Sequence, residues 1–188
     1  MPKLRSTITA ATLGVLLTTV LTGAAQAHDT YSGQGLVARN TDLGRTFVAM
    51  ENEHDAARRQ KLAERVVSPA YVQHNAIAPP GRAGLLTTMQ YLRTVMPDIR
   101  FTARDVFATN DRVVSRFTIT GTVTGAPYLD TPPTGQKIEY DGMDVWTVRD
   151  GQLYEHWDQF DTTRALVQLG VPGLPPTLVN AASQPVNR

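Results

Sequence analysis

The spacing of hydrophobic residues divides the chain into a helical first half and a second half of strands. Two segments place side chains at i, i+4, i+7 and i+11, which is the spacing of one helix face. The first stripe is Leu43, Phe47, Met50 and His54, and the second is Leu85, Met89, Leu92 and Met96. We therefore predict a helix that begins at a Thr41-Asp42 cap and another at 82–96, with a shorter helix at 56–67.

From residue 99 onward the spacing changes to the alternation of strands. The predicted strands cover residues 99–107, 112–124, 137–148 and 152–158, and a short strand at 70–75 precedes the third helix. A last helix over 162–169 is capped by Asp161. Helices followed by a meander of long strands are typical of an α+β fold. Because long strands twist, we expect a curved, mixed or antiparallel sheet whose one face is covered by the N-terminal helices.

The N-terminus predicts export. Lys3 and Arg5 precede an apolar stretch at 8–21, and Ala25-Gln26-Ala27 fits the small-x-small pattern of a signal peptidase site. We predict a signal peptide at 1–27, cleavage after Ala27, and a secreted or periplasmic protein with no membrane segment after cleavage. A flexible leader at 28–40, a folded domain at 41–170 and a Pro-rich tail at 171–188 then follow.

Composition excludes several classes of chemistry. The chain has no cysteine, which rules out disulfides, thiolate metal sites and cysteine nucleophiles. Lys and Arg number 18 and Asp and Glu 17, without a basic block, so we expect no nucleic-acid partner. Phosphate-binding glycine loops and G-x-S-x-G are absent, and the histidines lack the spacing of a ligand pair. We therefore expect neither a metal nor a cofactor.

The hairpin around Asp150-Gly151 can close in two ways. A two-residue loop pairs Arg149 with Gln152 and places Val145 opposite His156. A three-residue loop pairs Val148 with Gln152 and places Asp144 opposite His156 and Trp146 opposite Tyr154. We favour the three-residue loop, because it gathers polar and aromatic side chains on one face; these are Tyr140, Asp144, Trp146, Tyr154, His156 and Asp158.

A carboxylate beside an imidazole on an apolar surface has a clear chemical use. Burial raises the pKa of a carboxyl group, and a neighbouring histidine can orient it. Such a group can remove a proton next to a carbonyl or activate water. The same residues are also compatible with a satisfied polar cluster that has no catalytic role.

The segment TPPTGQKIEYDGMDVWTVRDGQLYEHWDQFDTTRALVQLG, residues 131–170, resembles the SnoaL-like polyketide cyclase and ester cyclase family. SPAYVQHN at 68–75 and the helix GRAGLLTTMQYLRTVMPDIRF resemble it too. The resemblance implies a cone-shaped α+β barrel like nuclear transport factor 2, cofactor-free chemistry and often a homodimer. It places Asp158 at the acid/base aspartate and His156 at a pocket histidine. Asp144 stands where the cyclases have another histidine.

Several further residues are candidates for the pocket wall. The resemblance places His74 at the pocket mouth, and Tyr71, Tyr140, Trp146 and Tyr154 are aromatic candidates. His54, at the end of the first helical stripe, is a candidate that can also be a core histidine. We also expect a homodimer through the outer sheet face that carries Val145 and Trp157.

These features support three functions. The first is a cyclase, lyase or isomerase that uses Asp158 with His156, and with Asp144 as a second carboxyl group, on a small hydrophobic carbonyl compound. The second is a non-enzymatic binder of an apolar metabolite. The third is a hydrolase of a reactive small molecule such as an epoxide.

Overall fold

A computed structural model describes residues 33–76 and 78–184. The predicted signal peptide and cleavage site lie outside this part of the chain. The elements, in chain order, are α1 (Gly33–Asn52), α2 (Ala56–Val66), β1 (Val67–Gln73), α3 (Gly81–Val95), β2 (Arg100–Ala108), β3 (Arg112–Thr122), β4 (Lys137–Arg149), β5 (Gln152–Phe160), α4 (Thr162–Gln168) and α5 (Pro176–Ala182). None of the described helices is long and apolar enough to cross a membrane.

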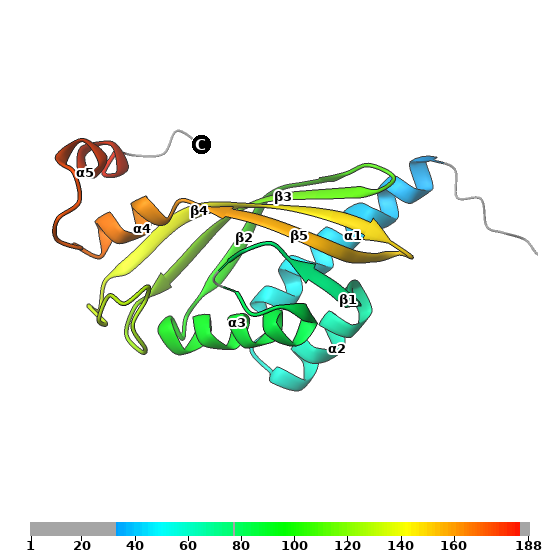
Figure 1. Cartoon of the computed structure of the whole chain (residues 1–188), viewed down its shortest axis with the longest axis horizontal. Helices are drawn as coiled ribbons and strands as arrows, with labels where there is room; N and C mark the ends of the chain where they lie inside the picture. The colour runs from blue at the N-terminus through cyan, green and yellow to red at the C-terminus, as the bar shows by residue number, and fades with distance from the viewer. Residues whose placement is uncertain (1–32, 77, 185–188) are drawn as a thin grey trace, which may run out of the picture. The chain divides into compact units, whose positions relative to one another are not determined.

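The described strands form one mixed sheet in the order β1-β5-β4-β3-β2. β1 pairs with β5 in parallel, and the other neighbouring strands are antiparallel. Helices α1, α2 and α3 cover one face of this sheet, and none of these three helices lies on the other face, which is called the uncovered face below (Figure 1). The α+β fold predicted from the sequence, with N-terminal helices over a curved sheet, is confirmed.

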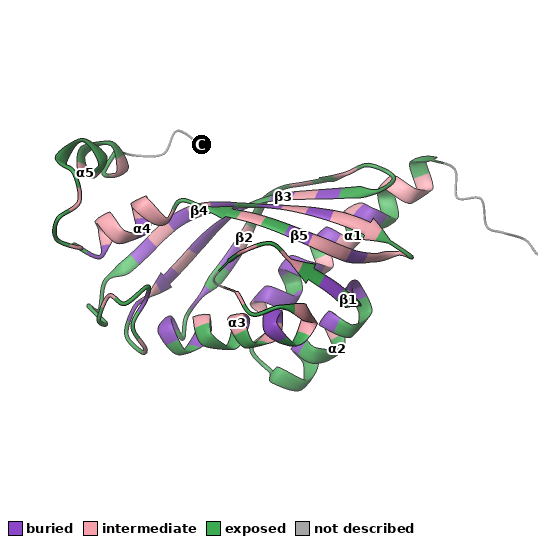
Figure 2. Ribbon diagram, in the orientation of Figure 1, coloured by how far each residue is buried: buried purple, intermediate pink, exposed green. Residues whose placement is uncertain are grey.

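The core lies between the helices and the covered sheet face (Figure 2). One group of buried side chains includes Phe47 and Met50 of α1 together with Trp146 of β4. A second group surrounds Phe117 and Ile119 of β3. The apolar stripes of α1 and α3 supply this layer, because each points its hydrophobic face at the sheet.

Helix α1 begins at Gly33, well before the predicted Thr41-Asp42 cap. The reason is a tertiary contact, because the buried Nδ2 of Asn40 donates to the carbonyl oxygens of Thr109 (2.8 Å) and Asn110 (3.0 Å) in the turn between β2 and β3. The prediction of a flexible leader up to residue 40 is therefore wrong for its last residues.

The proline-rich segment after Gly170 also contains a helix that its composition did not predict. α5 spans Pro176–Ala182, and Pro stands in its first turn, where a missing N–H costs nothing. Arg164 of α4 donates from Nη1 to the carbonyl oxygens of Ala182 (2.9 Å) and Gln184 (3.0 Å). These bonds satisfy carbonyl groups that the end of the helix leaves without an internal partner.

The β4–β5 hairpin closes by a two-residue loop, so our preference for a three-residue loop is wrong. Asp150 (φ 50°) and Gly151 (φ 73°) both have positive φ, and Arg149 pairs with Gln152. This is the tight turn that matches the twist of paired strands. The simple two-residue register does not continue, because a bulge at Tyr154 inserts one extra residue into β5.

The bulge restores the distribution of side chains that the three-residue loop predicted. Beyond it, Trp146 pairs with His156 and Asp144 pairs with Asp158. All four side chains therefore stand on one sheet face, although their partners differ from both predicted registers. Tyr154 itself leaves that set, and the guanidinium of Arg149 lies 3.9 Å from the centre of its ring.

Candidate active site

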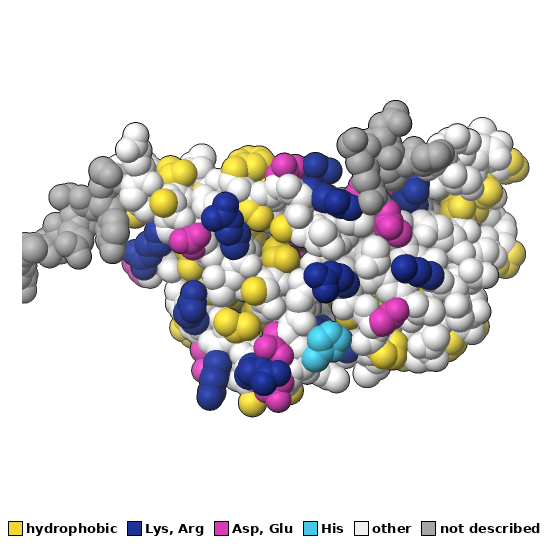
Figure 3. All heavy atoms as spheres, turned by 180° about the vertical axis from the view of Figure 1, so that it is seen from behind, with side chains coloured by type: hydrophobic (Ala, Val, Ile, Leu, Met, Phe, Trp, Pro, Cys, Tyr) yellow, Lys and Arg dark blue, Asp and Glu magenta, His cyan; other side chains and the backbone are white. Residues whose placement is uncertain are grey.

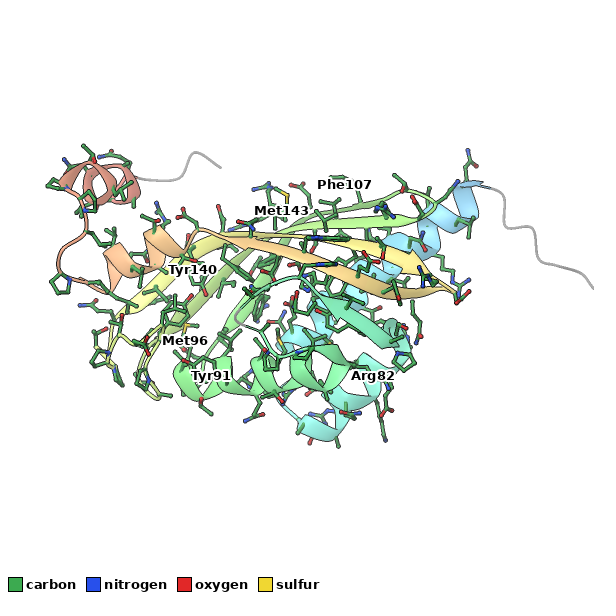
Figure 4. All side chains as sticks on the ribbon, viewed as in Figure 1. Arg82, Tyr91, Met96, Phe107, Tyr140 and Met143 are labelled. Atoms are coloured by element: carbon green, nitrogen blue, oxygen red, sulfur yellow. The ribbon has the colours of Figure 1, made fainter. Side chains whose placement is uncertain are left out.

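An apolar cavity of about 400 Å³ lies between α3 and the covered face of the sheet. Leu85, Met89 and Leu92 of α3 form one wall, and side chains of the sheet form the other, including Phe101, Ile119 and Tyr140. In Figure 4, Tyr140 stands on the side of the sheet that faces α3, whereas Met143 of the same strand stands on the opposite side. The cavity is polar mainly at the end where β1, β4 and β5 meet.

His156 is the centre of this polar end. Its Nε2 lies 3.0 Å from Oδ1 of Asp144, and its Nδ1 lies 2.9 Å from the hydroxyl of Tyr71. Ser115 donates to the second oxygen of Asp144 at 3.1 Å. Trp146 stacks on the imidazole, with ring centres 3.6 Å apart and planes 5° from parallel. The ring is thus fixed in position on its edges and on one face.

The hydroxyl of Tyr71 is the partner of His156 on the Nδ1 edge of the ring. Burial, followed by the charges of Asp158, Asp144 and Glu51, raises the pKa of Tyr71, so its hydroxyl keeps its proton. This hydroxyl lies within hydrogen-bond distance of Nδ1 of His156, and on the other edge of the ring Nε2–H donates to Asp144. His156 therefore has a side-chain partner at each ring nitrogen, Tyr71 at Nδ1 and Asp144 at Nε2.

Asp158 is the acidic group best placed to react with a ligand. Asn75 donates from Nδ2 to Oδ1 at 2.5 Å, and Oδ2 lies 3.9 Å from Nδ1 of His156, which is beyond hydrogen-bond distance. Burial raises the pKa of Asp158, against the opposing effects of His156 and the Asn75 hydrogen bond. Asn75 therefore orients one carboxyl oxygen, and Asp158 is one of the residues that line the cavity.

Glu51 is a third carboxyl group at the same end, and it is only 3 % exposed. It stands on the last turn of α1, whose end is fixed on two sides. Asn52 exchanges two hydrogen bonds with the backbone of Phe101 (2.8 and 2.9 Å), and Arg93 donates to the carbonyl oxygens of Glu51 and Glu53. These contacts bring a helix carboxyl group to the cavity.

The far end of the cavity contains a pair of tyrosines. The hydroxyl groups of Tyr128 and Tyr140 lie 3.0 Å apart, and both residues line the cavity. The hydroxyl of Tyr128 donates to that of Tyr140, so the hydroxyl proton of Tyr140 remains free to donate to another acceptor. A ligand that fills the cavity thus meets carboxyl groups at one end and a phenol pair at the other.

The structure does not bring all the sequence candidates to the cavity. His74 was expected at its mouth, but it stacks on Trp157 (ring centres 4.3 Å apart) and its Nε2 lies 3.6 Å from Glu155, on the uncovered sheet face. His54 is exposed in the turn after α1, and Tyr154 lies at the bulge. Tyr71 and Trp146 contact His156 from behind the cavity wall.

Three residues of the site were missed in the sequence. Gln73 and Asn75 follow Tyr71 at strand alternation, and Nε2 of Gln73 lies 3.3 Å from Nδ1 of His156. Because side chains alternate between the two faces of a strand, residues 73 and 75 are expected on the same face as Tyr71, and His74 is expected on the opposite face. Glu51 stands four residues after Phe47 and eight after Leu43, so helix spacing places it on the apolar face of α1, although a glutamate is seldom buried.

The described residues contain no group of three or more His, Asp and Glu that could hold a metal ion. Figure 3 shows basic and acidic side chains interspersed on one face of the protein, without a continuous basic stripe. The polar end of the cavity is thus a cluster of acid and imidazole groups within an apolar wall.

The chain is thus an α+β protein whose helices cover a curved sheet, with acid groups at one end of an apolar cavity. Its residues 41–169 match the model of the SnoaL-like polyketide cyclase family. The chain belongs to this family, which confirms the resemblance found in the sequence.

Solved structures agree with this assignment. TsrD from Streptomyces laurentii is 26 % identical, with a TM-score of 0.64, over 71 % of this chain and 96 % of that one. AclR from Streptomyces galilaeus is 26 % identical (TM-score 0.63; 78 % and 90 % covered), and IdmH from Streptomyces antibioticus is 30 % identical (TM-score 0.58; 70 % and 99 % covered). No protein of curated function matches the sequence.

Proposed function

We propose that this protein is a cofactor-independent acid/base enzyme that acts on a small hydrophobic carbonyl compound, as an aldol-type cyclase, a lyase or an isomerase. The observation that carries the proposal is Asp158. Its carboxyl group has a raised pKa, Asn75 orients one of its oxygens, and the residue lines a cavity whose walls are mainly apolar. A buried carboxylate with a raised pKa is a stronger base than one in water.

In this proposal Asp158 removes a proton from the carbon next to a carbonyl group. The C–H bond breaks, the proton goes to Asp158, and the electron pair forms an enolate. In a cyclase the enolate carbon forms a C–C bond to a second carbonyl carbon of the same molecule. The proton then passes from Asp158 to the new alkoxide, so that the enzyme returns to its initial state.

His156 and Asp144 are positioning residues in this scheme. The imidazole lies between Tyr71 and Asp144 and holds the wall beside Asp158 in one arrangement. Because both ring nitrogens have partners, His156 itself is not assigned the first proton transfer. The apolar walls exclude water, which would otherwise stabilise the carboxylate and weaken it as a base.

The experiment uses 2-tetralone, a flat hydrophobic ketone, as the probe. The protein is incubated with it in deuterium oxide, and deuterium uptake at the carbon next to the carbonyl is followed by mass spectrometry. We expect accelerated exchange that Asp158→Asn lowers at least about 100-fold, the range for loss of a general base. Asp105→Asn, at an exposed ion pair with Arg116, is the matched control. Full exchange by Asp158→Asn would refute the proposal.

Hydrolysis of an epoxide is the second candidate, because Glu51, Asp144 and Asp158 place three carboxyl groups at one end of the cavity. Two such groups in one site favour one acid and one base, which is the pair that opening an epoxide with water requires. Incubation of styrene oxide in ¹⁸O-labelled water distinguishes the two reactions, since only hydrolysis places the label in a diol.

A non-enzymatic binder of an apolar metabolite would use the same cavity without turnover. A compound that co-purifies equally with the unaltered protein and with Asp158→Asn, together with no exchange of 2-tetralone, would favour this function.

We also propose that the protein is exported. This rests on Lys3, Arg5, the apolar stretch at 8–21 and the Ala25-Gln26-Ala27 pattern. Cell fractionation followed by N-terminal sequencing tests it, with His28 expected as the first residue of the exported form. Full-length protein retained in the cytoplasm would contradict it.

Finally, we propose a homodimer through the uncovered sheet face. Phe107, Val114, Val145 and Trp157 are paired in one row across β2, β3, β4 and β5, and Phe107 and Trp157 are 57 % and 40 % exposed. An exposed row of this kind is typical of an interface. Light scattering should give twice the chain mass, and Phe107→Glu should halve it, whereas Leu178→Glu on α5 should not.

A further inference from the structure

Glu51 is a buried carboxyl group to which the proposed proton transfer gives no role. It lies on the cavity wall, and its Oε2 is buried without a hydrogen-bond partner among the described residues. A buried polar atom that lacks a partner costs free energy, and in native proteins it usually marks a place that a ligand or water fills. Because Glu51 lines the cavity, a ligand in the cavity can supply the partner that Oε2 lacks.

The charges that face Glu51 come from three elements. Asp144 of β4 and Asp158 of β5 are acidic, and Arg93 of α3 is the basic neighbour. Arg93 forms no ion pair with the Glu51 side chain within the described residues, because its Nη atoms donate to the backbone oxygens of Met89, Glu51 and Glu53. Glu51 therefore lies beside two acids without a direct counterion.

These surroundings favour the neutral form of Glu51. Burial is the largest effect, and the charge of Asp144 adds to it, so the pKa of Glu51 lies well above its usual 4.5 although Arg93 opposes the shift. A neutral carboxylic acid has an O–H to donate, which a carboxylate lacks. An acid kept neutral in an apolar site can donate to the oxygen of a carbonyl that becomes negatively charged.

We propose that Glu51 is a catalytic residue that stays neutral and donates a hydrogen bond to the carbonyl oxygen of the substrate while Asp158 removes a proton from the adjacent carbon. This rests on the proposed function. The C–H proton passes to Asp158, the negative charge moves to the carbonyl oxygen, and the O–H of Glu51 stabilises that oxygen. Glu51 keeps its proton throughout, so only Asp158 is protonated and deprotonated in each cycle.

The location of the two acids agrees with these separate roles. Glu51 enters the cavity from α1 in the helical layer, and Asp158 enters from β5 in the sheet. A substrate between them meets a donor on one side and a base on the other. Because the oxygen and the hydrogen-bearing carbon of an enolisable ketone are adjacent, both groups can contact one flat molecule.

Two substitutions at Glu51 test the role. Glu51→Gln has nearly the same shape and retains a neutral N–H donor, whereas Glu51→Leu has none. With 2-tetralone in deuterium oxide we expect Glu51→Gln to keep exchange within about tenfold, and Glu51→Leu to lose about 100- to 1000-fold, the range for removal of one oxyanion donor. Equal, severe loss in both variants would identify an essential carboxylate and overturn the proposal. Full activity in both would overturn it as well.

Two further measurements do not depend on turnover. The infrared difference spectrum between the unaltered protein and Glu51→Gln at pH 7 should contain the carbonyl band of a protonated carboxylic acid, and its absence would overturn the proposal. Binding of 2-naphthol, a stable mimic of the enol of 2-tetralone, should weaken about tenfold or more in Glu51→Leu and remain in Glu51→Gln. If both variants bind 2-naphthol as tightly as the unaltered protein, Glu51 does not contact the oxygen of the ligand and the proposal is contradicted.

These results separate the two proposals. If the unaltered protein does not exchange 2-tetralone, the proposed function fails, but the infrared band and 2-naphthol binding still decide whether Glu51 is a neutral donor. If exchange depends on Asp158 and is unaffected by Glu51→Leu, the function stands and the role of Glu51 fails. Thermal unfolding of each variant establishes that the compared proteins are folded.

Discussion

The hydrogen bonds of Asp144 give a prediction about stability that the structure makes quantitative. Its two carboxyl oxygens accept from Ser115 Oγ (3.1 Å) and His156 Nε2 (3.0 Å), and all three side chains are buried. Asp144→Leu removes both acceptors. Asp144→Asn keeps an oxygen for His156 and places an amide beside Ser115, whose hydroxyl can rotate to accept from it.

The two variants have the same charge and similar size, so their difference isolates the hydrogen bonds. Leaving a buried donor without an acceptor costs about 1–3 kcal/mol, and two donors lose their acceptor in Asp144→Leu. We therefore expect Asp144→Leu to be less stable than Asp144→Asn by about 2–6 kcal/mol. The lower half of this range applies if a change of tautomer lets His156 avoid a buried N–H without an acceptor.

The assay is urea unfolding at pH 7, followed by circular dichroism. The free energies of unfolding of the two variants are compared from their midpoints, provided that the dependence on urea concentration has the same slope in both. Glu155→Gln, on the same strand but on the uncovered face, serves as a control that should change stability by less than about 1 kcal/mol. A difference below about 1 kcal/mol between Asp144→Leu and Asp144→Asn would refute the reasoning that this chain of hydrogen bonds holds the site together.

Three further substitutions test other parts of the structure. The folded-state pKa of Glu51 lies above its unfolded value of 4.5, so this group binds more protons in the folded protein than in the unfolded one. Its contribution to stability is therefore fully present below pH 4.5 and is lost as the pH rises towards the folded-state pKa, by at most about 1.4 kcal/mol per pH unit. Urea titrations at several pH values should show a flatter dependence for Glu51→Gln; an unchanged slope contradicts it. Gly142→Ala places a methyl group 2.6 Å from the buried ring of Phe117 and should cost about 1–3 kcal/mol by urea unfolding; a neutral effect would show that the ring can move. Asp161→Ala removes the cap that accepts from the Arg164 N–H and should cost about 1 kcal/mol by the same measurement, whereas Asp161→Asn should not.

Apart from His54, which lies beyond the end of α1, the residues that recur at helix or strand spacing were assigned correctly from the sequence. The stripes of α1 and α3 and the alternation of β2 to β5 each depend on neighbours a few positions away, so one sequence contains the necessary information. The same holds for the Asp161 cap. Strand alternation also placed four side chains correctly on one sheet face, although the predicted loop length and strand pairing were wrong; these are Asp144, Trp146, His156 and Asp158.

The hairpin shows why local rules were insufficient. Asp150-Gly151 is compatible with both loops, and the register then depends on where the extra residue of β5 is placed. The choice was made by packing, because Leu153 is fully buried and Trp146 stacks on His156 only with the bulge at Tyr154. Sequence patterns specify which residues alternate, but not which residue is left out of the alternation.

The sequence by itself determined the fold class, the order of the elements up to α4, the family and the sheet face that carries Asp144, His156 and Asp158. Only the tertiary structure decided that Glu51 lines the cavity and that His74 lies on the other sheet face. The reason is physical: whether a carboxyl group is a solvated charge or a neutral acid depends on burial and on neighbours brought from distant parts of the chain. For Glu51 those neighbours are Asp144, Asp158 and Arg93, which three different elements supply.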